Sequence, residues 1–322
     1  MDARDQGTGP GIPGNDMGEF VPSYVNLYQA KVLEIRALRA LEALSACRLC
    51  PRHCGANRLS EDVGVCRVGR QARVSSFHSH FGEESPLVGT GGSGTIFFSS
   101  CNLLCIFCQN YEVSHLMEGD PVDKHELADM MMSLQRRGCH NVNLVSPTHM
   151  VPQILEALIP AVEQGLNIPL VYNSGGYDEV ETLRMLDGVI DLYMPDFKFW
   201  DNRWAERFCH VTDYRERVCA AIREMHRQVG DLVIDQDGIA RRGLLVRHLV
   251  MPGGMAGTGD IMRFLAEEIS PRTYVNIMAQ YHPAGKAMTD PLIDRRISRK
   301  EFGLAVDAAR HSGLRRLDGM RD

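Results

Sequence analysis

Three cysteines in one short stretch constrain this chain more than any other feature. Cys101, Cys105 and Cys108 form a C-x3-C-x2-C run, which directly follows the apolar residues 95–98 of a predicted strand. Three thiolates with this spacing can hold three irons of a [4Fe–4S] cube. No fourth cysteine follows at a matching short interval, so one iron would stay open to a ligand that is not protein. A zinc loop or three unrelated buried thiols are the alternatives, and the shared loop favours the cluster.

Length and composition are typical of a soluble protein. The chain has 322 residues, of which 44% are hydrophobic and 24% are charged, and its formal net charge is −6. A nucleic-acid binder usually carries a basic domain or stripe, so this balance argues against a nucleic-acid partner. No run approaches the roughly 18 apolar residues of a membrane span, and the Gly- and Pro-rich start lacks the pattern of a secretory signal. We therefore expect a cytoplasmic protein without a membrane partner.

The sequence pattern divides the chain into four parts. Residues 1–22 are expected to form a flexible tail. Residues 23–70 combine a helix, marked by periodic apolar positions over 25–45, with a small cysteine-rich metal-binding module. Residues 71–93 are predicted to be an irregular connecting segment. Residues 94–322 alternate between short apolar strands and amphipathic helices, and are expected to form the catalytic domain.

This alternation predicts an α/β fold with a parallel sheet. Right-handed crossovers curl such a sheet, and six strands are too few for an eight-stranded barrel, so we expect a partial (β/α)6 barrel. The predicted strands are residues 95–98, 142–145, 169–172, 190–194, 244–250 and 274–278. The predicted helices are residues 123–137, 151–165, 178–187, 211–229, 259–269 and 299–312.

Polar or glycine-rich residues follow each of these predicted strands. Chemistry in such folds is found at the carboxyl ends of the strands, so these residues are expected to meet at one rim. They are residues 101–108, 146–149, 173–176, 196–198, 252–254 and 280–282. The long segments 197–210 and 282–297 are candidates for substrate selection, because loops on a rigid scaffold often carry specificity.

The cysteine run, with the aromatic Phe107 before its last cysteine, resembles the cluster motif of the radical S-adenosylmethionine (SAM) enzymes. Within that superfamily, residues 94–312 resemble pyruvate formate-lyase activating enzyme and its uncharacterised activase-like relatives. Asp196 and Lys198 are similar to the D-x-K element of the activases, Arg247 to an arginine that contacts SAM, and His282 to a histidine at SAM. The resemblance implies that these four residues bind SAM, whereas taken singly they could be an ordinary ion pair, an arginine paired across the barrel and a structural histidine.

Two strand ends depart from the activase pattern. The activases carry a G-G-E element after their second strand, whereas this chain has residues 146–149 there, in which Thr148 could supply a hydroxyl to the SAM amino group. After the third strand Asn173 belongs to a stretch without the acidic residue of the activase cation site. These departures argue against pyruvate formate-lyase activation as such, and Thr148 and Asn173 remain candidate SAM contacts.

The resemblance implies a radical SAM oxidoreductase of the activating-enzyme type. Such an enzyme takes an electron from a flavodoxin or ferredoxin, cleaves SAM reductively at its [4Fe–4S] cluster and abstracts hydrogen from a substrate. A glycyl-radical enzyme is one candidate substrate. The alternative is a non-catalytic iron–sulfur or zinc protein that transfers electrons or acts as a scaffold.

A second group of cysteines lies near the start of the chain. Cys47, Cys50, Cys54 and Cys66 follow a C-x2-C-x3-C-x11-C pattern, which suits tetrahedral zinc or a fully ligated [4Fe–4S] cluster. The spacing does not choose between these metals. A fully ligated site leaves no position for substrate, so it would be structural or would relay electrons. The remaining cysteines are expected to pack on helices, and they are Cys139, Cys209 and Cys219.

Overall fold

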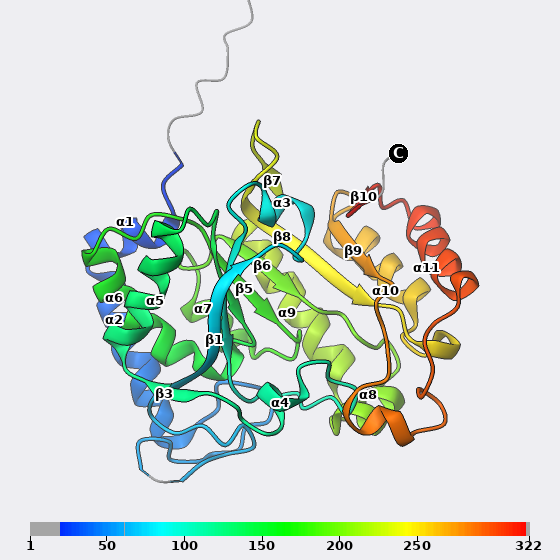
Figure 1. Cartoon of the computed structure of the whole chain (residues 1–322), viewed down its shortest axis with the longest axis horizontal. Coiled ribbons are helices and arrows are strands. Elements are labelled where there is room, and N and C mark those ends of the chain that lie inside the picture. The colour runs from blue at the N-terminus through cyan, green and yellow to red at the C-terminus, as the bar shows by residue number, and fades with distance from the viewer. Residues whose placement is uncertain (1–19, 61, 320–322) are drawn as a thin grey trace, which may run out of the picture.

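A computed structural model describes residues 20–60 and 62–319 (Figure 1). The predicted tail, residues 1–22, therefore lies outside the described residues except for its last three. The strands are β1 Ala72–His80, β2 Ser93–Phe98, β3 Asp120–Val122, β4 Val142–Val145, β5 Leu170–Ser174, β6 Leu192–Pro195, β7 Val233–Ile234, β8 Ala240–Leu249, β9 Tyr274–Met278 and β10 Arg316–Leu317. The helices are α1 Ser23–Gln29, α2 Val32–Glu42, α3 Ser85–Val88, α4 Tyr111–Ser114, α5 Lys124–Arg136, α6 Val151–Glu163, α7 Val180–Met185, α8 Asn202–Cys209, α9 Tyr214–Val229, α10 Thr258–Phe264 and α11 Arg299–His311.

The strands form one mixed sheet in the order β10-β9-β8-β6-β5-β4-β2-β1-β3, and β7 pairs with β8. From β2 to β10 the neighbours along this path are parallel, whereas β1 is antiparallel to both β2 and β3. All six predicted strands are present, and they lie side by side in chain order, as crossover connections predict. The α/β fold with a mostly parallel sheet is confirmed, while closure into a barrel is not seen in the strand pairing of the described residues.

Two apolar layers lie on the two faces of the sheet. Buried side chains such as Ile96, Leu144 and Tyr172 belong to the large core that also includes residues of α2, α5, α6 and α9. A smaller cluster lies on the other face, where Val171 and Met194 pack with Leu87 of α3. The alternation of the strand residues between two layers follows from their period of two. The face that carries the smaller cluster becomes polar toward the strand ends, where Asn173 follows Val171 and Asp196 follows Met194 at two-residue steps. The candidate site lies at this polar end.

Three parts of the sequence prediction were wrong. Residues 72–80 form a full strand, β1, instead of an irregular segment; a bulge between Val74 and Ser76 breaks the alternation that would have marked it. The predicted helix over 25–45 is divided, because Lys31 adopts a left-handed conformation (φ 59°) between α1 and α2. Residues 197–210 are not a simple loop, since they contain α8.

The described residues contain no helix that is long and apolar enough to cross a membrane. The first helix is tied to the sheet by Asp191, which precedes β6. Its Oδ1 accepts from the backbone N–H of Ser23 at 3.0 Å and its Oδ2 accepts from that of Leu170 at 3.2 Å. Because burial disfavours its charged form, the pKa of Asp191 is raised from 3.8 to about 6.

Replacing Asp191 by asparagine is expected to remove one pH dependence of stability. A carboxyl whose pKa is raised by folding stabilises the native state fully below pH 3.8, and this contribution is lost as the pH rises through about 6. The free energy of unfolding of the wild type, relative to Asp191→Asn, should therefore fall by about 3 kcal/mol between pH 3.8 and 7. Urea unfolding at a series of pH values measures this difference, and parallel curves for the two proteins would contradict it.

Candidate active site

The loop after β2 brings the three cysteines of the C-x3-C-x2-C run to one cavity of about 230 Å³. Cys105 is buried, and Cys101 and Cys108 are half-buried. Two non-glycine residues of this loop, Ser100 (φ 71°) and Leu104 (φ 54°), adopt the left-handed conformation. Each such residue costs about 1–3 kcal/mol and is held in place only by surrounding contacts. The loop is therefore shaped by its setting, and all three cysteines line the same cavity.

Phe107 anchors the cysteine loop by packing its side chain into an aromatic core. Its ring packs edge-on against Phe199, Phe208 and Tyr281, with ring centroids 5.8, 6.4 and 6.2 Å away. The backbone N–H of Ile106 also donates to the carbonyl of Phe208 at 2.9 Å. Phe208 lies in α8, so contacts with α8 and with the aromatic core hold the cysteine loop in position. The aromatic residue before the last cysteine thus positions the cysteine loop, and it also lines the cavity.

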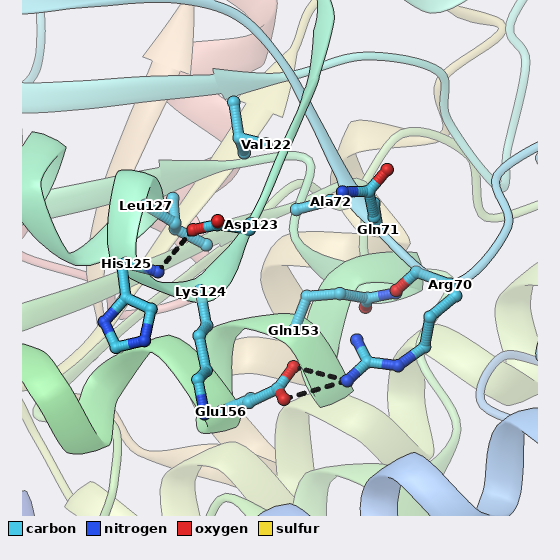
Figure 2. Close-up of a pocket in the computed structure, with 10 residues that line it drawn as sticks. All are labelled: Arg70, Gln71, Ala72, Val122, Asp123, Lys124, His125, Leu127, Gln153 and Glu156. Atoms are coloured by element: carbon cyan, nitrogen blue, oxygen red, sulfur yellow. Dashed lines mark hydrogen bonds and ion pairs between the residues drawn. The ribbon is translucent and has the colours of Figure 1, made fainter.

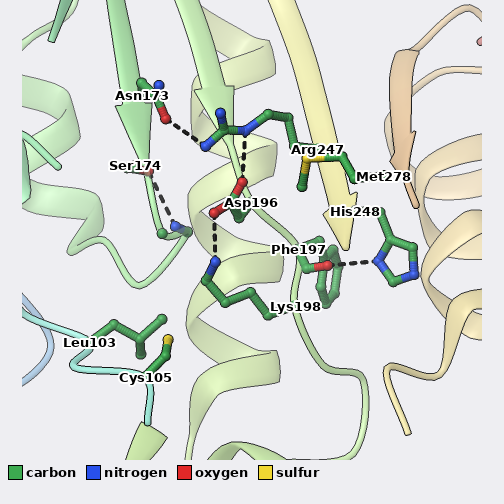
Figure 3. A network of polar contacts seen from close by, with 12 residues as sticks. Leu103, Cys105, Asn173, Ser174, Asp196, Phe197, Lys198, Arg247, His248 and Met278 are labelled. Carbon is green, nitrogen blue, oxygen red and sulfur yellow. Dashed lines mark hydrogen bonds and ion pairs between the residues drawn. The ribbon is translucent and has the colours of Figure 1, made fainter. Parts of the chain in front are cut away.

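Three charged side chains line another part of the same cavity (Figure 3). Asp196 directly follows β6; its Oδ2 lies 2.6 Å from Nζ of Lys198 and its Oδ1 lies 2.8 Å from Nε of Arg247. Arg247 lies on β8, and its Nη2 donates to Oδ1 of Asn173 at 2.7 Å. Four of the predicted SAM-binding residues, from three neighbouring strands, are thus joined in one network.

All three groups of this network are charged. Burial alone would raise the pKa of Asp196, but Arg247 and Lys198 together lower it below its ordinary value. Burial would lower the pKa of Lys198 and of Arg247, yet the Asp196 carboxylate raises both. The network therefore carries two positive charges and one negative charge. Such a wall suits the α-carboxylate of an amino acid, because guanidinium and ammonium groups donate to carboxylates.

The thiols depend on metal for their charge. Burial raises the pKa of Cys101 to about 12 and also raises that of Cys108, so without metal both remain neutral thiols. Iron binds thiolate, and loading a cluster therefore releases these protons. The pKa of Cys105 is also raised, by the hydrogen bond with Cys209 and by burial, and the positive charge of Lys198 opposes this rise only in part. Three cysteine sulfurs on one cavity, with a cation beside them, fit a cluster held at three corners.

Two further residues shape the rim at the ends of β5 and β6. Gly176 has φ 76°, and a Cβ there would lie 2.2 Å from the carbonyl oxygen of Asp196, so only glycine fits. The hydroxyl of the fully buried Tyr214 lies 3.0 Å from the carbonyls of Gly175 and Asp196, and it accepts from the N–H of Lys198. Tyr214 therefore fixes the backbone on both sides of the charged network. Its position on α9 gave no sequence signal.

Comparison with known proteins assigns this arrangement. The model of the radical SAM superfamily matches residues 95–236, which include the three cysteines, Asp196 and Lys198. The uncharacterized protein MJ0674 of Methanocaldococcus jannaschii is 32% identical over 309 residues, which cover 93% of this chain and 84% of that protein. The chain belongs to the radical SAM superfamily. The superfamily cleaves SAM at an iron–sulfur cluster, and the cysteine loop and charged network of this radical SAM protein provide residues for both.

Among solved structures, this radical SAM protein is similar to methylornithine synthase (PylB). The sequence identity is 13% and the TM-score is 0.46, with 92% of this chain and 75% of that chain covered.

Two predicted SAM contacts do not line the cavity of the radical SAM site. Thr148 is buried, and its hydroxyl donates at 2.6 Å to Asp178, which also accepts from Tyr172 at 2.9 Å and from Ser174 at 2.6 Å. His282 is half-buried beside the cavity, with its Nδ1 3.3 Å from Nε2 of Gln109. Their roles as SAM ligands stay predictions, and the cavity is lined by Ser146 where Thr148 was expected.

Sequence reasoning missed one residue near the cluster loop. Cys209 was expected to serve only as a packing residue on a helix, and it is indeed fully buried at the end of α8. Its Sγ, however, lies 3.3 Å from Sγ of Cys105. Cys219 does pack on α9, whereas Cys139 follows the end of α5. No local pattern could have shown the Cys209 contact, because the two cysteines are 104 positions apart.

Replacing Cys209 by alanine is expected to lower the reduction potential of the radical SAM cluster. Hydrogen bonds to ligand sulfurs are among the factors that set the potentials of iron–sulfur clusters. Loss of a bond worth about 1 kcal/mol corresponds to roughly 40 mV for one electron. Redox titration followed by electron paramagnetic resonance measures the shift. Cys209→Ser should keep most of the wild-type potential and Cys219→Ala all of it, and an unchanged potential in Cys209→Ala would contradict the contact.

The N-terminal cysteines lie together in a compact module beside the cluster loop. Cys47, Cys50 and Cys66 are buried, and Cys54 is exposed. In the described part of the chain, no three His, Cys, Asp or Glu side chains are placed to hold a single metal ion. The second metal site therefore stays a prediction at this point.

A separate cavity of about 320 Å³ lies between β3, α5 and α6 (Figure 2). Three of its charged groups already have partners. Nη2 of Arg70 lies 2.8 Å from each carboxylate oxygen of Glu156, and Asp123 caps α5 by accepting from the N–H of His125 at 2.7 Å. These contacts engage Arg70, Glu156 and Asp123 within the protein, and the cavity lacks the cysteines of the candidate site.

Proposed function

We propose that this protein removes a hydrogen atom from a protein substrate after reductive cleavage of SAM, as an activating enzyme does for a glycyl-radical enzyme. The observation that carries the proposal is the single cavity lined by both the three-cysteine loop and the network of Asp196, Lys198 and Arg247. When bound there, the cluster and SAM supply the hydrogen-abstracting chemistry. Cys101, Cys105 and Cys108 would hold the cluster, and the charged network would orient the amino-acid end of SAM.

The residues at the mouth of the cavity support a peptide substrate. Gln109 and Gln280 line the cavity and are exposed, as is the neighbouring Asn110. Side-chain amides both donate and accept hydrogen bonds, which matches the pairing needs of an extended peptide backbone. Leu249 and Met278 line the cavity from β8 and β9, and together they provide an apolar surface behind these amides. A glycine in a flexible loop of another protein would fit this combination.

The reductant is proposed to be a flavodoxin or ferredoxin, because cleavage of SAM consumes one electron at low potential. The chain's own residues then have three tasks. The cysteines keep one iron free for SAM, the charged network fixes the orientation of SAM, and the buried aromatic residues around Phe107 keep water from the reacting atoms.

The test has two stages. Anaerobic protein reconstituted with iron and sulfide, then reduced in the presence of SAM, should release methionine and 5′-deoxyadenosine. Absence of 5′-deoxyadenosine would instead support a non-catalytic iron–sulfur protein. In the second stage, candidate glycyl-radical enzymes labelled with deuterium at glycine should transfer deuterium to 5′-deoxyadenosine and develop a glycyl-radical signal. Transfer only from a small molecule would reject the activase role while keeping SAM cleavage.

A further inference from the structure

We propose that Cys47, Cys50, Cys54 and Cys66 hold a second [4Fe–4S] cluster, which takes electrons at the protein surface and passes them to the SAM-binding cluster. The relay rests on the proposed function, since it needs the SAM-binding cluster as its acceptor. The presence of the second cluster does not depend on that function. Two observations support the proposal: a buried guanidinium, and the contacts between the module and the cluster loop.

A fully buried arginine indicates a negative charge within the module. Arg58 has 0% exposure, and its Nη2 donates to the carbonyl of Gly69 at 3.3 Å while its Nε is buried without a partner. Its Nη1 lies 3.8 Å from Sγ of Cys47. Within residues 20–60 and 62–319, Arg58 forms no ion pair with a carboxylate, in contrast to the half-buried Arg247, which pairs with Asp196.

Arginine keeps its positive charge in proteins, and an unpaired buried charge costs several kcal/mol. Among the described residues, Cys47 places its sulfur beside Arg58, and as a thiolate it can supply the opposite charge. Four neutral thiols would leave the guanidinium uncompensated. Four thiolates bound to a [4Fe–4S] cluster carry a net negative charge and would pair with it. A metal-loaded module would therefore supply the counter-charge of Arg58.

The position of the module favours a cluster over zinc. Zinc bound to four thiolates would also compensate Arg58, but zinc does not change its oxidation state. A [4Fe–4S] cluster takes up and releases single electrons, and this module contacts the loop of the SAM-binding cluster, where an electron is needed.

The module lies between solvent and the loop of the SAM-binding cluster. Cys54 is exposed on one side. On the other side the carbonyl of Cys66 accepts from the hydroxyl of Ser100 at 2.5 Å, and Ser100 is bonded to Cys101. One hydrogen bond thus connects the backbone of Cys66 with the residue that directly precedes Cys101.

Arg52 adds a further connection between the two loops. Its Nε donates to the carbonyl of Asn102 at 2.9 Å and its Nη2 donates to that of Leu103 at 3.1 Å.

Each transfer in the proposed relay would move one electron. Reduced flavodoxin or ferredoxin would be oxidised and the second cluster reduced. The second cluster would then return to its oxidised state by reducing the SAM-binding cluster.

The metal content of a variant tests the second cluster directly. In the full-length protein with Cys101, Cys105 and Cys108 all replaced by alanine, anaerobic reconstitution should still load about four irons and four sulfides per chain. On reduction this cluster should give a paramagnetic resonance signal that SAM does not alter. Cys219→Ala, a buried cysteine outside both groups, should keep the wild-type iron content. Zinc alone, or no metal, in the triple variant would overturn the proposal.

The role of the Arg58 charge and the electron relay between the two clusters are tested by separate variants. Arg58→Met should lose the iron of the second cluster, whereas Arg58→Lys, which keeps a positive charge, should retain it; equal retention by both would refute the charge argument.

In Cys50→Ala, the ratio of SAM cleavage driven by flavodoxin to that driven by dithionite should fall below the wild-type ratio. An unchanged ratio would refute the relay. Failure of the wild type to cleave SAM with dithionite would refute the proposed function, and the iron count would still decide the second cluster.

Discussion

Replacement of Cys105 by alanine is expected to abolish SAM cleavage. Cys105 is the buried member of the three cysteines, and its Sγ lies 3.3 Å from that of Cys209. With two thiolates left, the cube would expose two irons and lose the anchor that holds it against the cavity wall. We therefore expect loss of the SAM-binding cluster and no 5′-deoxyadenosine above background.

Iron analysis together with chromatography of the reaction mixture measures both effects. Because the N-terminal module is proposed to hold its own cluster, iron should fall by about four per chain instead of to zero. Cys139→Ala is a matched control, since Cys139 is also buried but lies after α5, away from the cavity. A Cys105→Ala protein with full iron content and normal product would remove Cys105 from the ligand set.

Replacement of Asp196 by alanine is expected to reduce both stability and SAM binding. Its carboxylate lies 2.6 Å from Lys198 and 2.8 Å from Arg247, and the residue is 9% exposed. Removing it leaves two cations close together without their shared counter-ion. The loss of one partner from a buried ion pair costs about 3–5 kcal/mol. Glu83, whose Oε2 lies 3.8 Å from Nη1 of Arg247, should relieve part of this cost.

The pH dependence of the effect follows from the lowered pKa of Asp196, which Arg247 and Lys198 produce against the opposing effect of burial. A carboxyl with a lowered pKa contributes stability above its unfolded value of 3.8 and loses it as the pH falls through the folded value. The difference in unfolding free energy between wild type and Asp196→Ala should thus be largest near neutral pH and shrink in acid.

Urea unfolding and calorimetric titration with SAM measure the two consequences of this substitution. Asp260→Ala is a suitable control, because Asp260 forms an exposed pair with Arg263 at 3.0 Å, and such pairs contribute about 0–1 kcal/mol. A variant Asp196→Ala with wild-type stability would show that the two cations find other partners. Unchanged SAM affinity would show that the network does not orient SAM.

The sequence could predict most of the candidate site because the site lies at strand ends. Parallel strands that follow one another in the sheet bring their carboxyl ends to one edge. Cys105 after β2, Asn173 on β5 and Asp196 after β6 therefore had to lie near one another once the strands were recognised. The distances and the sharing of Asp196 between Lys198 and Arg247 depend on side-chain directions, which local patterns do not contain.

The sequence alone determined the α/β class, the order of the six central strands and the cysteine loop, because apolar periodicity and ligand spacing are local properties. Only the tertiary structure decided which side chains from distant segments meet. It buried Thr148 against Asp178, placed Cys209 beside Cys105 and enclosed Arg58 among the N-terminal cysteines. These contacts arise when helices and loops pack onto the sheet. Their partners are separated by up to 104 positions, too far for any short-range pattern to encode.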